Sequence, residues 1–259
     1  MSSLIYSISR EALGLREPRW TNEGEILNLD RHVLMGWPQL HGSRKFSMRA
    51  QHRCDREQIF AFLDDAAHRE GFAYKDVVQP FALAAWPGLA RFRVLKVTRD
   101  VAEVAASMLE RGWHYPAVAA TTSPAGLPQA AVARARRAAV THSLWRIAAR
   151  RVVRTPVHDR WTAQLLLDEL ITGLLLAERA LSSVAGETVA YADAVRDPQC
   201  LLTALRRLYP DRELGNPSYI DEGFARRRAA LEARRRSPKF ERLRRRVQTI
   251  RDALDEARS

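Results

Sequence analysis

The sequence predicts an α/β fold with a largely parallel sheet, because two extended segments are each followed closely by a helix-start signal. Arg91–Thr98 (RFRVLKVT) is rich in β-branched and apolar residues and predicts a strand, and Asp100 with Glu103 resembles a capping box. Glu187–Tyr191 (ETVAY) predicts a second strand, and Asp197-Pro198 then supplies a cap and a first helical proline. Such alternation favours parallel strands, whose carboxyl ends are where ligands bind.

The first third of the chain carries shorter signals. Leu4–Ile8 (LIYSI) is a β-type run that predicts a strand, and Thr21–Asn28 (TNEGEILN) is a compact polar segment. Asp55 resembles an N-cap, and the apolar spacing after it predicts a helix that ends at Gly71. Phe72–Val78 (FAYKDVV) alternates well enough to predict another strand. These segments extend the α/β pattern towards the N-terminus.

The middle and C-terminal parts are predicted to be rich in helices. Apolar side chains repeat at helical spacing after Asp100, residues 114–130 predict a loop, and helices are predicted near 131–151 and 160–183. The basic C-terminal part carries an apolar seam of Phe240, Leu243, Val247, Ile250 and Leu254. We expect an α/β domain over 1–220 and a basic helical extension over 221–259 that packs on it. A homodimer through this helix is the alternative.

The composition excludes several classes of protein. Apolar residues make up 46% of the 259 residues and charged residues 28%, which is ordinary for a globular chain with a core. No apolar run is long enough to span a membrane and no secretory signal is visible, so we expect a cytoplasmic protein. Cys54 and Cys200 predict buried thiols, and the scattered histidines predict no metal.

The positive charge is carried almost wholly by arginine. The formal net charge is +12, and of the 42 basic residues four are lysine and 38 are arginine. Arginine prefers planar partners such as phosphate, sulfate and carboxylate, so an anionic ligand is one interpretation. The alternative is a GC-rich genome that encodes arginine where others encode lysine, with many arginines on a solvated helical face.

The segment Val94–Ser107 (VLKVTRDVAEVAAS) combines the end of a predicted strand with an arginine and a serine that could bind a phosphate. Arg99 lies at the predicted carboxyl end of the strand and Ser107 two turns into the next helix, and both side chains suit a phosphate. The segment resembles Arg-Asp-Pro-x-Asp-Val-Ala-x-Ser of sulfotransferases that use 3′-phosphoadenosine 5′-phosphosulfate (PAPS), in which the Arg and Ser hold the 3′-phosphate. Glu103 replaces the family's Asp and Val101 its Pro. The resemblance implies a P-loop-type three-layer fold and PAPS as co-substrate.

Two further segments resemble the same family in the same order. Glu187–Pro198 (ETVAYADAVRDP) is similar to the family's Val-x-Tyr-Glu-Asp-Leu and its later Asp-Pro, with Ala192 departing. Gly24–Asn28 (GEILN) resembles Gly-Glu-x-x-Asn of bacterial carbohydrate sulfotransferases, in which a glutamate near this place serves as base. Together the three segments imply transfer of a sulfuryl group from PAPS to a hydroxyl of a small-molecule or carbohydrate acceptor.

The phosphosulfate loop departs from the family. The family reads Ser-Arg-Ser-Gly-Thr after its first strand, and its glycine lets backbone N–H groups close on the phosphate. Here Ser9 and Arg10 follow the predicted strand and are the expected binding residues, but Glu11-Ala12-Leu13 come next. The glycine and the hydroxyl donors are missing, so the sequence supports binding of the 3′-phosphate better than binding of the sulfate.

An active enzyme needs a base and a cation for the leaving group. Glu25, with Glu23 behind it, is the candidate base, and Lys75 and Arg10 are candidates for holding charge on the bridging oxygen. A carboxylate near a helix start and an exposed lysine in a strand are the structural alternatives. The alternative bases are His41, His52 and His114.

Two other functions compete with the enzyme. A catalytically degenerate relative that binds a nucleotide or an interaction partner tolerates the altered loop. A nucleic-acid binder explains the basic charge, but no recognised module is visible and the basic tail lacks interleaved aromatic residues.

Overall fold

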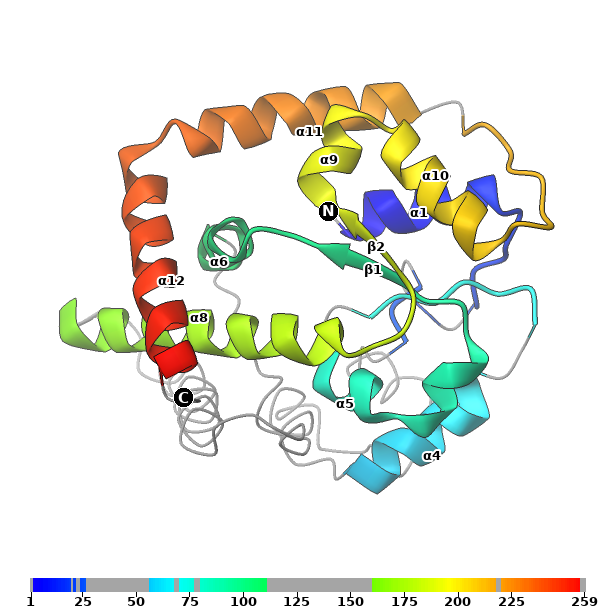
Figure 1. Ribbon diagram of the computed structural model, residues 1–259, viewed down its shortest axis with the longest axis horizontal. Coiled ribbons are helices and arrows are strands. Elements are labelled where there is room, and N and C mark those ends of the chain that lie inside the picture. The colour runs from blue at the N-terminus through cyan, green and yellow to red at the C-terminus, as the bar shows by residue number, and fades with distance from the viewer. Residues whose placement is uncertain are drawn as a thin grey trace, which may run out of the picture.

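The computed structural model describes residues 2–19, 21, 24–26, 56–67, 70–76, 80–110, 160–217 and 220–256. Within these residues the chain is a helix-rich α/β protein with a small sheet of two parallel strands (Figure 1). In chain order the elements are α1 (Ser2–Ala12), α4 (Arg56–Ala66), α5 (Pro80–Ala85), the 3₁₀ turn η3 (Pro87–Arg91), β1 (Leu95–Thr98), α6 (Val101–Glu110), α8 (Arg160–Ser182), β2 (Glu187–Ala190), α9 (Tyr191–Arg196), α10 (Gln199–Leu208), α11 (Ile220–Arg235) and α12 (Pro238–Glu256).

The two strands pair in parallel, so their carboxyl ends meet at one edge. The register joins Leu95 to Glu187 at the start and Thr98 to Ala190 at the end. Gly186 precedes β2 with a φ of 141°, and a Cβ there would lie 2.3 Å from the carbonyl oxygen of Val94. Glycine therefore lets β2 begin this close to β1.

Helix α1 corrects one prediction. Leu4–Ile8 was expected to be a strand, and these residues lie inside α1 instead. Ile5, Ile8 and Ala12 are spaced by three and four residues and are buried together against β2, α9 and α10. A five-residue apolar run fits both periods, and the helical period prevails because this stripe covers one side of the core.

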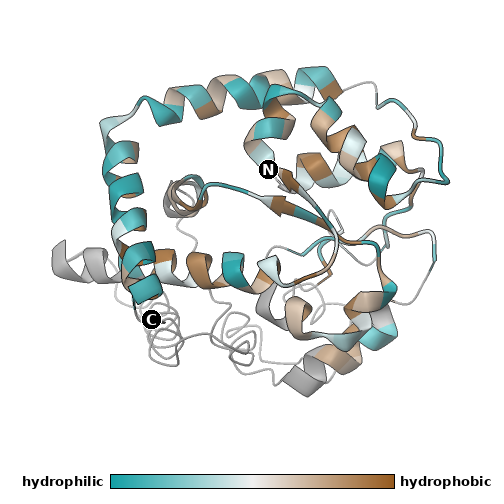
Figure 2. Cartoon of the chain, viewed as in Figure 1, coloured by the Kyte–Doolittle hydropathy of each residue, from teal (hydrophilic) through white to brown (hydrophobic). Residues whose placement is uncertain are grey.

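A second core lies between α6, α8 and α12. The predicted C-terminal seam forms one side of it: Phe240, Leu243, Val247 and Leu254 are buried, and Ile250 is partly buried. These side chains pack on apolar residues of α6 and α8, such as Ala105 and Leu175. Figure 2 shows that most residues of α12 and many residues of α11 are hydrophilic. Both helices therefore expose their arginines around a narrow buried stripe.

The other predictions agree in kind and shift in their bounds. Helix α4 ends at Ala66, and Gly71 follows with a positive φ of 75°. The strand predicted over Phe72–Val78 is reduced, in the described residues, to isolated parallel bridges that pair Phe72 with Arg16 and Lys75 with Glu25. Both later strands are shorter than predicted, because Arg91 lies in η3 and Tyr191 already begins α9.

Helix α10 begins at Gln199, one residue after the predicted first helical position, and its cysteine is not buried as predicted. The Oδ1 atom of Asp197 accepts a hydrogen bond from the backbone N–H of Gln199 at 3.0 Å, which caps the first turn. Cys200 was expected to be buried and is exposed. The reason is that Leu201, Leu202 and Leu205 hold the inner face of α10, which leaves position 200 on the outer face.

Several predictions fall outside the described residues. These are the loop over 114–130, the helix near 131–151, the cap at Asp55, and Glu23, His41, His52, Cys54 and His114. In the part of the chain that is described, no helix is long and apolar enough to cross a membrane.

Candidate anion-binding site at the carboxyl ends of the strands

A pocket of about 570 Å³ opens where β1 and β2 end. One wall comes from the strand ends and the first turn of α6, and the other comes mainly from α12. The lining residues include four arginines and three carboxylates: Arg99, Arg244, Arg245, Arg251, Asp100, Glu178 and Glu241. Ligands of parallel α/β sheets bind at this edge, which makes the pocket the candidate functional site.

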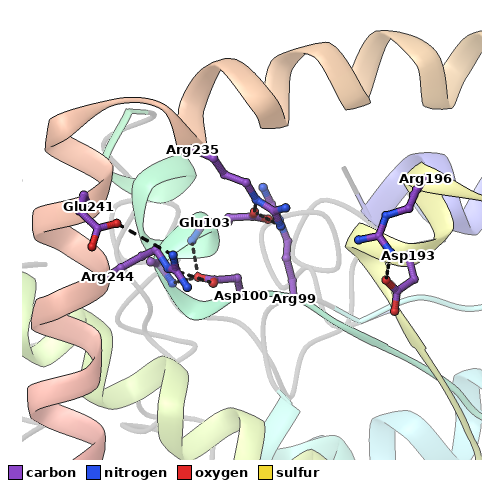
Figure 3. Close-up of polar contacts among 9 residues, drawn as sticks. Arg99, Asp100, Glu103, Asp193, Arg196, Arg235, Glu241 and Arg244 are labelled. Atoms are coloured by element: carbon purple, nitrogen blue, oxygen red, sulfur yellow. Dashed lines mark hydrogen bonds and ion pairs between the residues drawn. The ribbon is translucent and has the colours of Figure 1, made fainter.

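Arg99 stands at the tip of β1 and is largely buried. Its Nε donates to Oε2 of Glu103 at 3.3 Å (Figure 3). Its guanidinium carbon lies 5.1 Å from the ring centroid of Tyr191. Burial lowers the pKa of Arg99, and the carboxylate of Glu103 opposes that shift. The Nη2 atom of Arg99 is buried without a hydrogen-bond partner in the described residues, so it is a donor available to a ligand.

Glu103 joins Arg99 to the end of α11. The carboxylate is only 1% exposed, and its Oε1 atom accepts a hydrogen bond from Nε of Arg235 at 2.8 Å. Two guanidinium groups thus share one buried carboxylate, which compensates for the cost of removing the charges of Glu103 and Arg99 from water, while Arg235 stays 46% exposed. The pair fixes the side chain of Arg99 at the strand tip. Glu103 therefore has a structural task here.

Asp100 caps α6, as the sequence predicted. Its Oδ1 atom accepts hydrogen bonds from the backbone N–H groups of Ala102 at 2.8 Å and Glu103 at 3.3 Å. Because these first-turn amides are already used, the positively charged donors that face the pocket are side chains of arginine.

Ser107 lies on α6 one turn after Glu103 and is 9% exposed. Arg99 and Ser107 were expected to bind one phosphate together. Arg99 lines the pocket, whereas Ser107 is not among the described residues that line it.

Glu25 and Lys75 come together at a second place, beside the first turn of α1. The Nζ atom of Lys75 lies 3.4 Å from Oε1 of Glu25 and donates to Oγ of Ser3 at 3.2 Å. It also lies 5.7 Å from the ring centroid of Tyr6. Lys75 is buried, which corrects the alternative of an exposed lysine. The two predicted catalytic residues form an ion pair, and neither lines the pocket at the strand ends.

Ser9 and Arg10 do not form a loop after a strand. Both lie in the second half of α1, where the backbone N–H groups serve the helix and cannot close on a phosphate. Their side chains still carry buried polar atoms without partners in the described residues, namely Oγ of Ser9 and Nε of Arg10. The prediction that Ser9 and Arg10 lie in a phosphosulfate loop is therefore wrong, because both residues are helical.

Sequence reasoning missed the contribution of α12 and of Tyr191. Arg244, Gln248 and Arg251 are spaced by four and three residues, so the sequence predicts that they share one face of a helix. It does not predict that this face lines the pocket. Tyr191 is buried and its Oη has no partner in the described residues. Burial raises the pKa of Tyr191, against the opposing charge of Arg99. The basic stripe of α12 could have indicated this wall of the pocket from the sequence. From the sequence, Tyr191 had only an architectural role.

Comparison with known proteins gives no relative: no family model, no curated protein and no solved structure matches this chain. In the described residues, no group of three or more His, Cys, Asp or Glu side chains could hold a metal ion. The fold and the pocket therefore define the class as a helix-rich α/β protein with an arginine-lined site at the carboxyl edge of a parallel strand pair.

Proposed function

We propose that the pocket binds an adenosine nucleotide through its phosphate groups, and that the protein is a PAPS-dependent sulfotransferase with a P-loop-type fold. The observation that carries the proposal is the position of Arg99 at a strand tip, lining the pocket with a buried donor that has no partner in the described residues. An unpaired buried guanidinium nitrogen costs free energy unless a ligand or water satisfies it. The bidentate geometry of arginine suits phosphate.

The acceptor is a hydroxyl of a small molecule or carbohydrate, and PAPS supplies the sulfuryl group. Glu25 is the proposed base for the acceptor proton, and the ammonium of Lys75, 3.4 Å from it, holds negative charge near the leaving oxygen. Oγ of Ser9 and Nε of Arg10, both buried without partners in the described residues, are further donors on α1. Arg99 binds the phosphate that does not react.

A second candidate is a nucleotide-binding protein without transferase activity. It is favoured by the location of Ser9 and Arg10 inside α1 and by the ion pair of Glu25 with Lys75 away from the pocket. A base that is paired with a lysine must exchange that partner for the acceptor hydroxyl before it can take a proton.

Binding of adenosine 3′,5′-bisphosphate tests both candidates. At a concentration of about 100 times its Kd this nucleotide should stabilise the protein by about 2.7 kcal/mol, seen as a rise in Tm by differential scanning fluorimetry. Arg99→Gln should remove most of the rise, whereas Arg196→Gln, on an exposed arginine paired with Asp193 outside the pocket, should keep it.

The outcomes separate the candidates. A nucleotide-dependent rise in Tm together with release of the bisphosphate from PAPS in the presence of hydroxyl acceptors supports the transferase. The same rise without transfer to any acceptor in a broad panel supports the binding protein. No rise in the parent protein, or an equal loss in Arg99→Gln and Arg196→Gln, contradicts both.

A further inference from the structure

The arginines of α12 that line the pocket or face α8 differ in how fully they are neutralised, and Arg251 does both. Towards α8, the guanidinium of Arg246 binds both carboxylate oxygens of Asp168, and Nη1 of Arg251 lies 3.0 Å from Oε2 of Glu178. These pairs, together with the apolar seam, account for the attachment of the helix.

Towards the pocket, Arg244 and Arg245 are only weakly neutralised. Arg244 approaches Asp100 and Glu241, but both contacts are 3.9 Å long, which is beyond hydrogen-bond distance (Figure 3). The side chain of Arg245 makes no ion pair or hydrogen bond within the described residues. Both guanidinium groups thus keep their planar donors free beside the same pocket.

The acidic side chains that line the pocket do not neutralise Arg244 and Arg245 fully. Oδ1 of Asp100 is used to cap α6, and Glu178 is held by Arg251. Glu241 remains half-exposed and lies one turn before Arg244, where it can turn to water when another anion takes its place. Like charges gathered beside one pocket repel each other, and an oxyanion relieves that repulsion.

We propose that Arg244 and Arg245 form a second oxyanion subsite on the α12 wall of the pocket, while Gln248, one turn after Arg244, donates its amide to Asp252. The ligand then carries two negative groups, one at Arg99 on the strand wall and one at α12. The second group is a carboxylate, sulfate or phosphate, and it belongs either to an anionic acceptor or to the nucleotide itself. This inference rests on the proposed function for the use of the pocket as a ligand site.

Inorganic pyrophosphate is the probe for this subsite. Its affinity is measured by isothermal titration calorimetry at a fixed ionic strength of about 0.15 M, because a basic chain attracts anions unspecifically at low salt. The expected result is one site per chain, weakened about tenfold in the double variant Arg244→Gln/Arg245→Gln, as loss of charge-assisted hydrogen bonds requires. Arg242→Gln, on an exposed arginine of the same helix that does not line the pocket, should bind within about twofold of the parent.

Two results overturn the inference: pyrophosphate does not bind at millimolar concentration, or Arg242→Gln weakens it as much as the double variant does. Urea unfolding of each variant checks that a loss of affinity is not a loss of fold. Adenosine 3′,5′-bisphosphate then identifies the source of the second group. If the double variant also weakens this nucleotide, the nucleotide supplies the group; if only pyrophosphate weakens, an anionic acceptor supplies it.

The same titrations keep this inference separate from the proposed function. Pyrophosphate that binds through Arg244 and Arg245, without any binding of the nucleotide, supports the subsite and contradicts the sulfotransferase. If the nucleotide binds in a way that depends on Arg99, and the double variant weakens neither the nucleotide nor pyrophosphate, the proposed function is supported and the subsite is overturned.

Discussion

Two buried tyrosines of this protein differ in what their hydroxyl groups contact. Oη of Tyr6 donates to the backbone oxygen of Ala73 at 3.1 Å, whereas Oη of Tyr191 is buried with no partner in the described residues. Burial raises the pKa of both tyrosines. A buried hydroxyl without a partner costs free energy, whereas a paired one contributes about 1 kcal/mol to stability.

The same substitution should therefore act differently at the two positions. We expect Tyr6→Phe to lower the free energy of unfolding by about 1 kcal/mol, because a hydrogen bond is lost. Tyr191→Phe should leave it unchanged or raise it by up to about 1 kcal/mol, because an unsatisfied group is removed. Urea unfolding near pH 7 measures both values. A loss in Tyr191→Phe as large as that in Tyr6→Phe would mean that its hydroxyl has a partner.

At the scale of elements, α12 has two tasks on two faces. Its buried seam closes the core formed with α6 and α8, and its arginines form one wall of the pocket. The two sets alternate along one helix because 3.6 residues complete a turn, so positions three and four apart share a face. Substitutions in one set should therefore leave the other set intact.

Phe240→Ala tests the buried face. Removing a buried phenylalanine side chain should lower the free energy of unfolding by about 3–5 kcal/mol, through lost burial and the cavity that remains. The control is Thr249→Ala, on the exposed side of the same helix, which should change stability by less than about 0.5 kcal/mol. Chemical denaturation gives both numbers. Equal effects at the two positions would contradict docking of the seam.

At the scale of the whole molecule, the core is not complete before the C-terminal helix is in place. The described apolar residues form separate clusters, and the one between α6 and α8 includes four buried side chains from α12. The predicted division into a domain over 1–220 and an extension over 221–259 therefore cuts through a shared core. The same cut removes a wall of the pocket.

A chain that ends at Ser237 should reveal this dependence. Without α12, apolar side chains of α6 and α8 such as Val101 and Leu175 face water. We expect a broad thermal transition at lower temperature and stronger binding of a hydrophobic dye, compared with the full chain, since the cluster loses cover. A sharp transition at the parent's Tm would instead establish residues 1–237 as a unit that is stable without α12.

The sequence was most informative where local chemistry decides the structure. Asp100 and Asp197 cap their helices as predicted, because a carboxylate next to a helix start satisfies amides of the first turn whatever the rest of the fold is. The parallel strand pair and the buried seam of α12 also follow from patterns of apolar residues. The prediction failed at Leu4–Ile8, where a short run fits two periods and only its neighbours select the helix.

The sequence by itself determined the α/β class, the starts of α6 and α10, the placement of Arg99 at a strand tip and the surplus of arginine. Only the tertiary structure decided that Glu103 holds Arg99, that Glu25 pairs with Lys75, and that α12 faces the strand ends. The physical reason is the range of the interactions. Caps and periods act within a few residues, whereas a pocket is made by elements far apart in the chain that meet because their apolar faces must be buried.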